Sequence, residues 1–460
     1  MNLDSYSHFH IIGVGGSGMS AIARVLAERG YSVSGSDMQE SKFSAELRTI
    51  GVRIYIGHSA TYVSDAELVV RSSAIPDSNP EVIAARLAGI PVLKRSQFLG
   101  SLMAGSLGIA VAGTHGKTPT TSMIAQVLVE AGLDPTVIVG GVVPMLGSNA
   151  RAGEGDYFVI EADEYDRMFL GLAYDIALIN NLEHDHPDIF DSDAKYVEAF
   201  AQFAAQTPAH GQLIINGDDV LSQPLVELVN SDVYRVGLSD ASDMWAEDIR
   251  PNQLGGNDFI VMERHNLLGI ARLRVPGEHN VRNALMAIAV ANSIGIDFHH
   301  IRKGLAEFGG VGRRFQEIGT VSGVTIVDDY AHHPTEIKVT LAAAQQRFAG
   351  RTVWAVWQPH TYSRVKLHFD AFANAFADAD KALVLDIYRS RERDTLGVSS
   401  ELLVDAMSHP YARHVDTIEV AANYILERIA PDDVVLTLSA GDGNRVGALV
   451  LEALQARLAA

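Results

Sequence analysis

Short apolar runs and helical segments alternate along this chain of 460 residues. Residues 8–12 predict a strand, residues 19–29 carry apolar side chains at helical spacing, and residues 31–34 predict the next strand. The same alternation continues to the C-terminus. Strands separated by helices pair in parallel, so the pattern predicts an α/β fold with parallel sheets covered by helices.

The middle and last thirds of the chain repeat this pattern. Residues 109–112 predict the end of a strand, and residues 123–128 predict an apolar helix face that ends near Gly132. Further elements are expected as strands at residues 156–160, 175–179, 325–327, 353–357, 383–385 and 434–438 and as an apolar helix at residues 284–291. Polar residues directly follow these strands, where an open α/β sheet binds its ligands.

The chain is long enough for several domains, and we divide it into three. The boundaries are placed after PVLKRSQ (residues 91–97) and in the glycine-rich stretch at residues 309–312. The predicted domains are an N-terminal Rossmann-like domain (1–97), a central domain of the P-loop ATPase type with a parallel or mixed sheet (98–312) and a C-terminal Rossmann-like domain (313–460).

The composition narrows the class of protein. The chain carries 36 basic and 56 acidic residues, a net charge of −20, which argues against nucleic acid as the main partner. It has no cysteine, so disulfides, thiolate metal sites and cysteine nucleophiles are excluded. The N-terminus lacks a signal-peptide pattern, and no apolar run reaches the length of a membrane helix. We therefore expect a cytoplasmic protein that does not act at a membrane.

The segment GTHGKT at residues 113–118 has the composition of a nucleoside-triphosphate phosphate loop. Its glycines allow backbone N–H groups to approach phosphate oxygens, Lys117 supplies a positive charge, and the Thr118 hydroxyl suits a magnesium ion. The strict pattern has glycine where this chain has Val111, so the loop is a shortened variant. The predicted strand before it and the helix after it favour a triphosphate site over a glycine-rich turn that binds nothing.

A second glycine loop, GVGGSG at residues 13–18, follows the first predicted strand. Together with Asp37, about 20 residues further on, it matches the dinucleotide fingerprint. The same geometry holds any diphosphate, and a chain with a separate triphosphate loop can use the first loop for a nucleotide-linked substrate. A nicotinamide cofactor and a purely structural turn are the alternatives.

Two loops rich in carboxylates and histidines follow strands of the central domain. They are EADEYD at residues 161–166 and NNLEHDHP at residues 180–187. Carboxylates near a triphosphate site suggest ligands for Mg²⁺, which prefers hard oxygen donors. The pattern does not choose between His184 and His186 as a further ligand, and a solvated acidic loop is the alternative for any single residue.

Polar clusters also mark the start of one helix and the ends of the C-terminal strands. GEHNVRN at residues 277–283 opens an apolar helix, where it either binds a purine or ribose or only caps the helix. Four further clusters are DDYAHHP (328–334), QPHTYSR (358–364), DIY (386–388) and SAGDG (439–443). Because parallel strands end at a shared edge, these clusters predict a site there, with purely structural histidines as the alternative.

The order of these motifs resembles that of the Mur ligase family over nearly the full chain. The matching segments are GVGGSGM, SD at 36–37, SSAI at 72–75, GTHGKT, EADEYD, NNLEHDHPD, PGEHNVRNA, GGVGRRF, DDYAHHPTE and QPHTYSR. The resemblance implies an ATP-dependent ligase of peptidoglycan synthesis that uses Mg²⁺. Its implied reaction joins L-alanine to the carboxylate of UDP-N-acetylmuramate through an acyl phosphate.

The resemblance implies a role for each matching residue. The UDP substrate is expected at Gly13, Gly15, Gly16, Gly18, Asp37, Ser72 and Ser73. ATP is expected at Gly113, Thr114, His115, Gly116, Lys117, Thr118, Thr120, His279, Asn283, Arg313 and Arg314. The amino acid is expected at Tyr330, His332, His360 and Arg364, and Mg²⁺ at Thr118, Glu161 and His186. The residues expected to act in catalysis are Lys117, His332, His333 and Arg364.

Two positions depart from the family pattern. Pro119 stands where threonine is usual, which the first turn of a helix tolerates. Thr361 stands where some members carry arginine, so recognition of the amino-acid carboxylate is expected to depend more on Arg364.

Three rival classes of protein remain open. A recycling ligase of the same family attaches a whole tripeptide to UDP-N-acetylmuramate; Glu164 and Tyr165 favour it, but residues 166–175 are short where we expect an insertion. The second phosphate loop argues against an NAD-dependent oxidoreductase. A non-catalytic nucleotide switch is argued against by the retention of the phosphate-loop lysine and the metal residues.

The chemistry predicts that the domains act together. Phosphoryl transfer depends on positioning and charge neutralisation, so no protein nucleophile is needed. The attacking amine must be neutral, and His332 or His333 is expected to take its proton because histidine titrates near neutral pH. The ATP motifs and the amino-acid candidates lie in different domains, so domain closure is expected to assemble the site. We expect a monomer or a homodimer.

Overall fold

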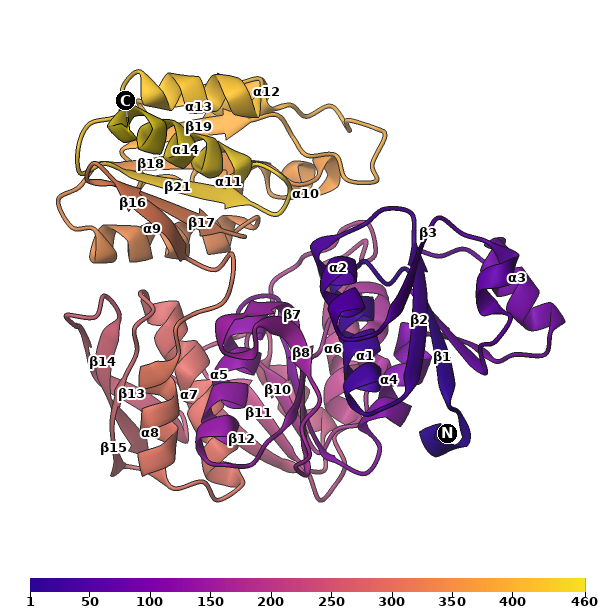
Figure 1. The fold of residues 1–460 in the computed structure, drawn as a ribbon. Helices are drawn as coiled ribbons and strands as arrows, with labels where there is room; N and C mark the ends of the chain where they lie inside the picture. The colour runs from indigo at the N-terminus through magenta and orange to yellow at the C-terminus, as the bar shows by residue number, and fades with distance from the viewer. Residues whose placement is uncertain (460) are drawn as a thin grey trace.

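The computed structural model describes residues 1–459 and contains three sheets, each covered by helices (Figure 1). The N-terminal sheet is parallel, in the order β3-β2-β1-β4-β5. Its strands are β1 (His8–Ile12), β2 (Ser32–Asp37), β3 (Arg53–Ile56), β4 (Leu68–Arg71) and β5 (Val92–Lys94). Its helices are α1 (Ser17–Glu28), α2 (Lys42–Thr49), α3 (Pro80–Leu87) and α4 (Arg95–Met103). The strand order reverses between β1 and β4, which creates a crevice for a ligand.

The central sheet has ten strands in the order β15-β14-β13-β12-β11-β10-β6-β9-β7-β8. They are β6 (Leu107–Ala112), β7 (Thr136–Val143), β8 (Ser148–Arg151), β9 (Tyr157–Glu161), β10 (Ile176–Ile179), β11 (Gln212–Asn216), β12 (Asp232–Gly237), β13 (Met244–Pro251), β14 (Asn257–Glu263) and β15 (Asn266–Arg272). The helices are α5 (Lys117–Glu130), α6 (Asp193–Ala205), α7 (Glu278–Ser293) and α8 (Phe298–Glu307). The middle of the sheet is parallel, whereas β8, β14 and β15 pair in the antiparallel direction.

The C-terminal sheet has six strands in the order β16-β17-β21-β18-β19-β20. They are β16 (Gln316–Val321), β17 (Val324–Asp329), β18 (Val353–Gln358), β19 (Lys381–Leu385), β20 (Ala412–Val415) and β21 (Val434–Ser439). The helices are α9 (Pro334–Arg347), α10 (Tyr362–Leu367), α11 (Phe369–Ala373), α12 (Ser400–Ala406), α13 (Ile418–Leu426) and α14 (Arg445–Ala459). All neighbouring strands are parallel except the pair β16 and β17.

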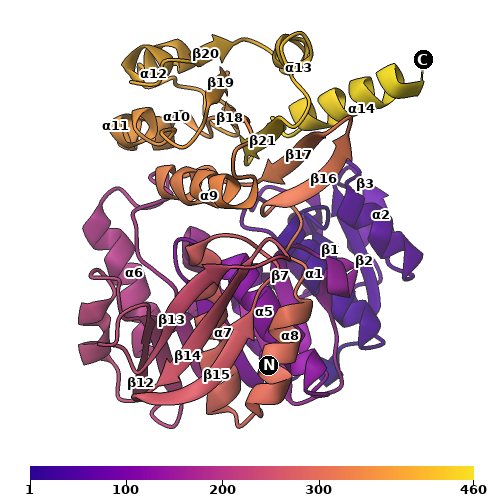
Figure 2. The ribbon, with the colours of Figure 1, turned by 90° about the vertical axis from the view of Figure 1, so that its left-hand side faces the viewer.

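The three domains pack against one another in different ways. One apolar core runs from the N-terminal domain into the central domain, where α1 lies against β7 and β8. The C-terminal domain has apolar cores of its own, and α9 faces the central domain across polar side chains (Figure 2). The N-terminal and central domains therefore form one body, and the C-terminal domain is the part that is docked by polar contacts.

The sequence predicts the fold class correctly. The predicted strands match β1, β2, β6, β9, β10, β17, β18, β19 and β21, and the expected apolar helix at residues 284–291 lies inside α7. The central sheet is mixed, because strands β13 to β15 pair in the antiparallel direction and no helices separate them. The boundary after residue 97 falls within α4, and the boundary after residue 312 falls between α8 and β16; this division stays a prediction.

No helix within residues 1–459 is both long and apolar enough to cross a lipid bilayer.

Candidate active site

The GTHGKT loop lies between β6 and α5. Gly113 and Gly116 both adopt left-handed backbone angles, with φ of 131° and 77°. A Cβ atom at Gly113 would lie 3.0 Å from Asn180, and one at Gly116 would collide with Oδ1 of Asn283. Glycine alone fits at both positions, so the loop has the open backbone that close approach of a phosphate requires.

Lys117 begins α5 and extends back over the loop. Its Nζ atom donates hydrogen bonds to the carbonyl oxygens of Gly113 (2.6 Å) and Thr114 (3.1 Å) and lies 2.9 Å from the Glu164 carboxylate. Burial alone would lower the pKa of Lys117, but Glu164 raises it above its usual value. The ammonium group is therefore held in its charged form beside the loop.

The hydroxyl groups of two expected ATP ligands, Thr114 and Thr120, form hydrogen bonds with other protein groups. The Thr114 hydroxyl donates to the carbonyl oxygen of Glu183 at 2.8 Å and lies 2.9 Å from the Tyr196 hydroxyl. Thr120 is fully buried, and its hydroxyl donates to Oδ1 of Asn283 at 3.3 Å. Both side chains fix the loop against its neighbours, and direct contact of their hydroxyls with ATP stays a prediction.

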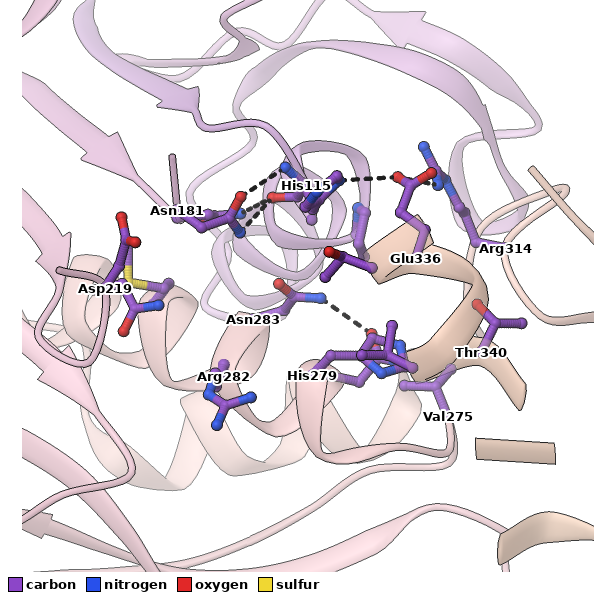
Figure 3. Close-up of a pocket in the computed structure, with 18 of the residues that line it drawn as sticks. His115, Asn181, Asp219, Val275, His279, Arg282, Asn283, Arg314, Glu336 and Thr340 are labelled. Atoms are coloured by element: carbon purple, nitrogen blue, oxygen red, sulfur yellow. Dashed lines mark hydrogen bonds and ion pairs between the residues drawn. The ribbon is translucent and has the colours of Figure 1, made fainter. Parts of the chain in front are cut away.

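A cavity of about 590 Å³ lies beside the loop, between the central and C-terminal domains (Figure 3). His115 and Asn181 line one side of it, and His279 and Thr340 lie across from them. The remaining walls come from the loops after β10 and β11, the start of α7 and the start of α9. Its size is in the range of small-molecule binding sites.

The structure separates the two arginines of the GGVGRRF motif. Arg314 lines the cavity (Figure 3). Arg313 turns to the end of the C-terminal sheet, where Nε donates to Asp328 at 3.1 Å and Nη2 donates to the carbonyl oxygen of Ser439 at 2.7 Å. Of the two expected ATP ligands, Arg314 is therefore the one positioned at the cavity.

The start of α7 supplies the far wall of the cavity. Burial, together with the positive charges of Arg282 and Arg314, lowers the pKa of His279 to about 4. Asn283 donates from Nδ2 to Oδ1 of Asn280 at 3.1 Å. A neutral imidazole and an oriented amide suit an uncharged polar ligand group, such as a purine or a ribose, at this wall.

The expected magnesium ligands lie around the phosphate-loop lysine. Glu161 ends β9, and its Oε2 atom accepts a hydrogen bond at 2.7 Å from a main-chain N–H of β7. Nε2 of His186 lies 3.7 Å from Oε1 of Glu164. Thr118 is buried in the first turn of α5. The hydroxyl and the carboxylate are hard donors that fit Mg²⁺, which needs few protein ligands because it retains several waters.

The residues expected to bind the amino acid lie around Asp185. Nε of Arg364 donates to Asp185 Oδ1 at 2.7 Å, and both side chains are 5% exposed. Nε2 of His332 lies 3.8 Å from the same carboxylate, and Nδ1 of His360 lies 3.0 Å from Nη1 of Arg364. The ring of Tyr330 lies against that of His332, with centroids 5.4 Å apart. The four expected residues lie together, but Arg364 already has a carboxylate partner within the protein.

The two adjacent histidines differ in their surroundings. His332 is partly exposed, and its Nδ1 lies 3.0 Å from the carbonyl oxygen of Tyr330. His333 is buried, and its Nδ1 accepts a hydrogen bond from the Thr335 N–H at 3.3 Å as the N-cap of α9. Burial and the nearby charge of His115 lower the pKa of His333 to about 3. His333 is therefore neutral and structurally engaged, whereas His332 faces Asp185.

The GVGGSG loop sits at the switch point of the N-terminal sheet. Gly13 has a φ of 84°, and Gly16 is the N-cap of α1. The main-chain N–H of Gly15 donates to Oδ2 of Asp37 at 2.9 Å. Asp37 therefore contacts the loop itself, in addition to its expected role toward a ligand.

Opposite this loop lie the residues that follow β4. Ser72 lies close to the loop, because a Cβ atom added at Gly13 would lie 3.0 Å from the Cβ atom of Ser72. Ser73, the next residue, is exposed. Arg95 lies over Gly18 and pairs with Asp163 of the central domain at 3.0 Å. Arg95 was not expected from the sequence, because its contacts are with residues distant in the chain.

Glu336 is a second residue that the sequence analysis missed. Its Oε2 atom accepts main-chain N–H groups of His332 (3.0 Å) and His333 (3.3 Å), and its Oε1 atom lies 3.3 Å from Nδ1 of His115. The sequence signal that could have identified Glu336 is its position three residues after the N-cap of a helix, which is typical of a capping box.

Three family models match successive parts of the chain. They are the Mur ligase family catalytic domain at residues 8–106, the Mur ligase middle domain at residues 111–291 and the Mur ligase glutamate ligase domain at residues 313–441. The chain belongs to the Mur ligase family. The matches to these three models confirm the family resemblance predicted from the motifs, and they set aside the alternative of an NAD-dependent oxidoreductase.

Relatives of this Mur ligase match it over nearly their full length. It is 44% identical to the UDP-N-acetylmuramate–L-alanine ligase of Salinibacter ruber, over 97% of this chain and 94% of the relative. It is also 44% identical to the enzyme of the same name from Rubrobacter xylanophilus, over 98% and 99% of the two chains.

Two solved structures resemble this Mur ligase. The UDP-N-acetylmuramate-alanine ligase from Thermotoga maritima has a TM-score of 0.81 at 28% identity, covering 98% of this chain and 99% of that one. A murein peptide ligase from Psychrobacter arcticus has a TM-score of 0.72 at 27% identity, covering 97% and 98%.

Proposed function

We propose that this Mur ligase joins L-alanine to the carboxylate of UDP-N-acetylmuramate with ATP, in the synthesis of peptidoglycan precursors. The observation that supports it most strongly is the full-length similarity, at 44% identity, to ligases of that name. We further propose that the protein is cytoplasmic and acts as a monomer or a homodimer.

ATP is proposed to bind with its phosphates at the GTHGKT loop and its nucleoside in the adjoining cavity. The left-handed glycines and the charged Lys117 support the phosphate position. His279, Asn283 and Arg314 support the nucleoside position because they line the cavity. The N–H groups at the start of α5 and the lysine neutralise the charge that spreads over the transferred phosphoryl group.

Thr118, Glu161 and His186 are proposed to hold Mg²⁺. The supporting observation is the donor set, in which a hydroxyl and a carboxylate oxygen lie close to the phosphate-loop lysine. When bound, Mg²⁺ would offset negative charge on the phosphates.

The proposed reaction has two steps. The substrate carboxylate first attacks the terminal phosphorus of ATP, the bond to ADP breaks, and an acyl phosphate forms. The neutral amine of L-alanine then attacks the acyl carbon, an amide bond forms, the C–O bond to phosphate breaks, and the nitrogen loses a proton. Activation is needed because a carboxylate resists attack by an amine.

His332 is proposed to accept that proton. A carbonyl oxygen cannot donate a hydrogen bond, so the contact of Nδ1 with Tyr330 O fixes the hydrogen on Nδ1 and leaves the lone pair on Nε2. Asp185, 3.8 Å from Nε2, stabilises the imidazolium that forms. His333 is proposed to support the site through its N-cap, because both its burial and its hydrogen bond remove it from the reacting groups.

The amino acid is proposed to bind among Tyr330, His332, His360 and Arg364. Arg364 keeps its charge, since burial alone would lower its pKa but Asp185 raises it. Its ion pair with Asp185 leaves it two proposed roles, orienting Asp185 and contacting the amino-acid carboxylate.

The UDP part of the substrate is proposed to lie at the switch point of the N-terminal sheet. Supporting contacts come from the start of α1 and from Asp37, which the loop itself holds in place. The expected residues are Gly13, Gly15, Gly16, Gly18, Asp37, Ser72 and Ser73.

An isotope experiment tests the proposed chemistry. The protein is incubated with Mg-ATP, L-alanine and UDP-N-acetylmuramate labelled with ¹⁸O in its carboxylate, and the products are analysed by mass spectrometry. An acyl phosphate transfers one labelled oxygen to inorganic phosphate when the amide forms. Amide formation with unlabelled phosphate would contradict the proposed intermediate, and absence of the amide would contradict the ligase function.

A further inference from the structure

We propose that Glu336 is a positioning residue that links the phosphate loop to His332, the proposed proton acceptor. This role rests on the proposed function, because the two linked groups serve the two steps of the proposed ligase reaction. Glu336 lies in the first turn of α9 and is only 8% exposed. A buried carboxylate is costly unless donors surround it, so its partners indicate what it holds in place.

One oxygen of Glu336 fixes both the backbone and the ring of His332. Its Oε2 atom accepts the main-chain N–H of His332 at 3.0 Å and lies 3.2 Å from Nδ1 of the same residue. The carbonyl oxygen of Tyr330 also faces this Nδ1 atom, so both of its neighbours are acceptors and its hydrogen stays in place. The lone pair of His332 is therefore kept on Nε2, the atom proposed to take the proton.

The other oxygen of Glu336 faces the phosphate loop, between His115 and Arg314 (Figure 3). Oε1 lies 3.3 Å from Nδ1 of His115 and 3.5 Å from Nη1 of Arg314. Burial alone would lower the pKa of His115, but Glu183 and Glu336 raise it to about 9. His115 is therefore an imidazolium that donates a hydrogen from each ring nitrogen to one of these carboxylates.

A second contact joins the same histidine to the same helix. Nε2 of His115 lies 2.9 Å from Oε2 of Glu183, which follows β10 in the central domain. The other oxygen of Glu183 accepts the Thr335 hydroxyl of α9 at 2.7 Å. The first turn of α9 is therefore attached to the phosphate loop through both nitrogens of one imidazolium ring.

The linkage matters between the two proposed steps of the reaction. The acyl phosphate forms beside the phosphate loop, and the amine must attack it before water does. Hydrolysis would return the substrate carboxylate and release phosphate without an amide. Because a displacement of about 1 Å can lower a rate by about 10²-fold, loss of the linkage should slow amide formation and leave more of the intermediate to water.

The ratio of phosphate to amide tests the linkage. Glu336→Gln removes the charge but retains an oxygen that can accept the main-chain N–H of His332, and His115→Asn removes the partner and leaves Glu336 in place. Both are assayed with saturating Mg-ATP, UDP-N-acetylmuramate and L-alanine. We expect equal amounts of phosphate and amide from the original chain. Each variant should release an excess of phosphate, with kcat for the amide lowered about tenfold or more.

The double variant tests whether the two residues act through one contact. Glu336→Gln combined with His115→Asn should then lower kcat no further than the more affected single variant does. Glu419→Gln is the control, because it changes an exposed glutamate in the first turn of α13 and should behave as the original chain does.

Two results would overturn this role of Glu336 alone. They are equal amounts of phosphate and amide in both single variants, and losses of kcat that multiply in the double variant. Absence of the amide with the original chain would overturn the proposed function together with this role.

Discussion

At the scale of single residues, the two adjacent histidines that precede α9, His332 and His333, are expected to have separable effects. His332→Ala should lower kcat by about 10²–10⁴-fold, because the proton acceptor is lost. His333→Asn keeps the helix cap and should lower kcat less. Steady-state kinetics against pH measure both. A larger loss of kcat in His333→Asn than in His332→Ala would contradict the assignment.

The lowered pKa of His279 makes the free energy of unfolding depend on pH. Its pKa is about 4 in the folded protein and 6.5 in the unfolded chain, so the unfolded chain binds more protons between these values. Stability should therefore fall as the pH drops from about 6.5 to about 4, by at most about 3 kcal/mol from this residue. His279→Asn should show a smaller drop in unfolding temperature over this range.

An exposed histidine provides the control for that experiment. His300→Asn removes an imidazole at the surface of α8 and should leave the pH dependence of unfolding unchanged. Identical pH profiles for His279→Asn and the original chain would show that His279 is not the source of the effect.

Residue types could be predicted from the sequence, but several partners could not. The lysine and glycines of GTHGKT follow from local spacing, because one strand, one loop and one helix define the geometry. The pairing of Arg364 with Asp185 joins residues 179 positions apart, so no local pattern reveals it. The choice of Arg314 over Arg313 likewise depends on the direction of two adjacent side chains at a domain boundary.

At the scale of elements, the turn from β6 into α5 depends on space at Gly116. Gly116→Ala and Gly132→Ala introduce the same Cβ at similar backbone angles, with φ of 77° and 75°. At Gly116 the methyl group collides with Asn283, whereas nothing lies within 4 Å at Gly132. We expect ATP affinity to fall at least tenfold in Gly116→Ala alone, measured by calorimetry with Mg-ATP. An equal loss in both variants would point to backbone strain instead.

The elements that were predicted well are those with a strong periodic signal. Strands β6, β9 and β10 are continuous apolar runs buried on both faces, and α7 is apolar over most of its length. Strand β14 alternates between buried and partly exposed side chains, and β15 is mostly exposed, so their antiparallel pairing depends on short connections more than on apolar content.

At the scale of the whole molecule, the C-terminal domain should be the part that moves. It is docked by polar contacts, among them the buried pair of Asp185 with Arg364, whereas the other two domains share an apolar core. Asp185→Asn leaves Arg364 buried without a charge partner, which costs on the order of 3–5 kcal/mol. We expect a larger radius of gyration by X-ray scattering and a lower kcat.

The control for that variant is a carboxylate outside the interface. Asp370→Asn changes an exposed residue of α11 and should leave both the scattering and kcat unchanged. An unchanged radius of gyration in Asp185→Asn would mean that this ion pair does not hold the domains together.

The identity of the acceptor is the central claim, and one measurement tests it most directly. Phosphate release from Mg-ATP is followed with UDP-N-acetylmuramate present, after addition of L-alanine, of the murein tripeptide or of neither. We predict that L-alanine stimulates release and yields the amide product, and that the tripeptide does not. Stimulation by the tripeptide alone would assign the protein to recycling, and no stimulation by either would contradict the muramate ligase function.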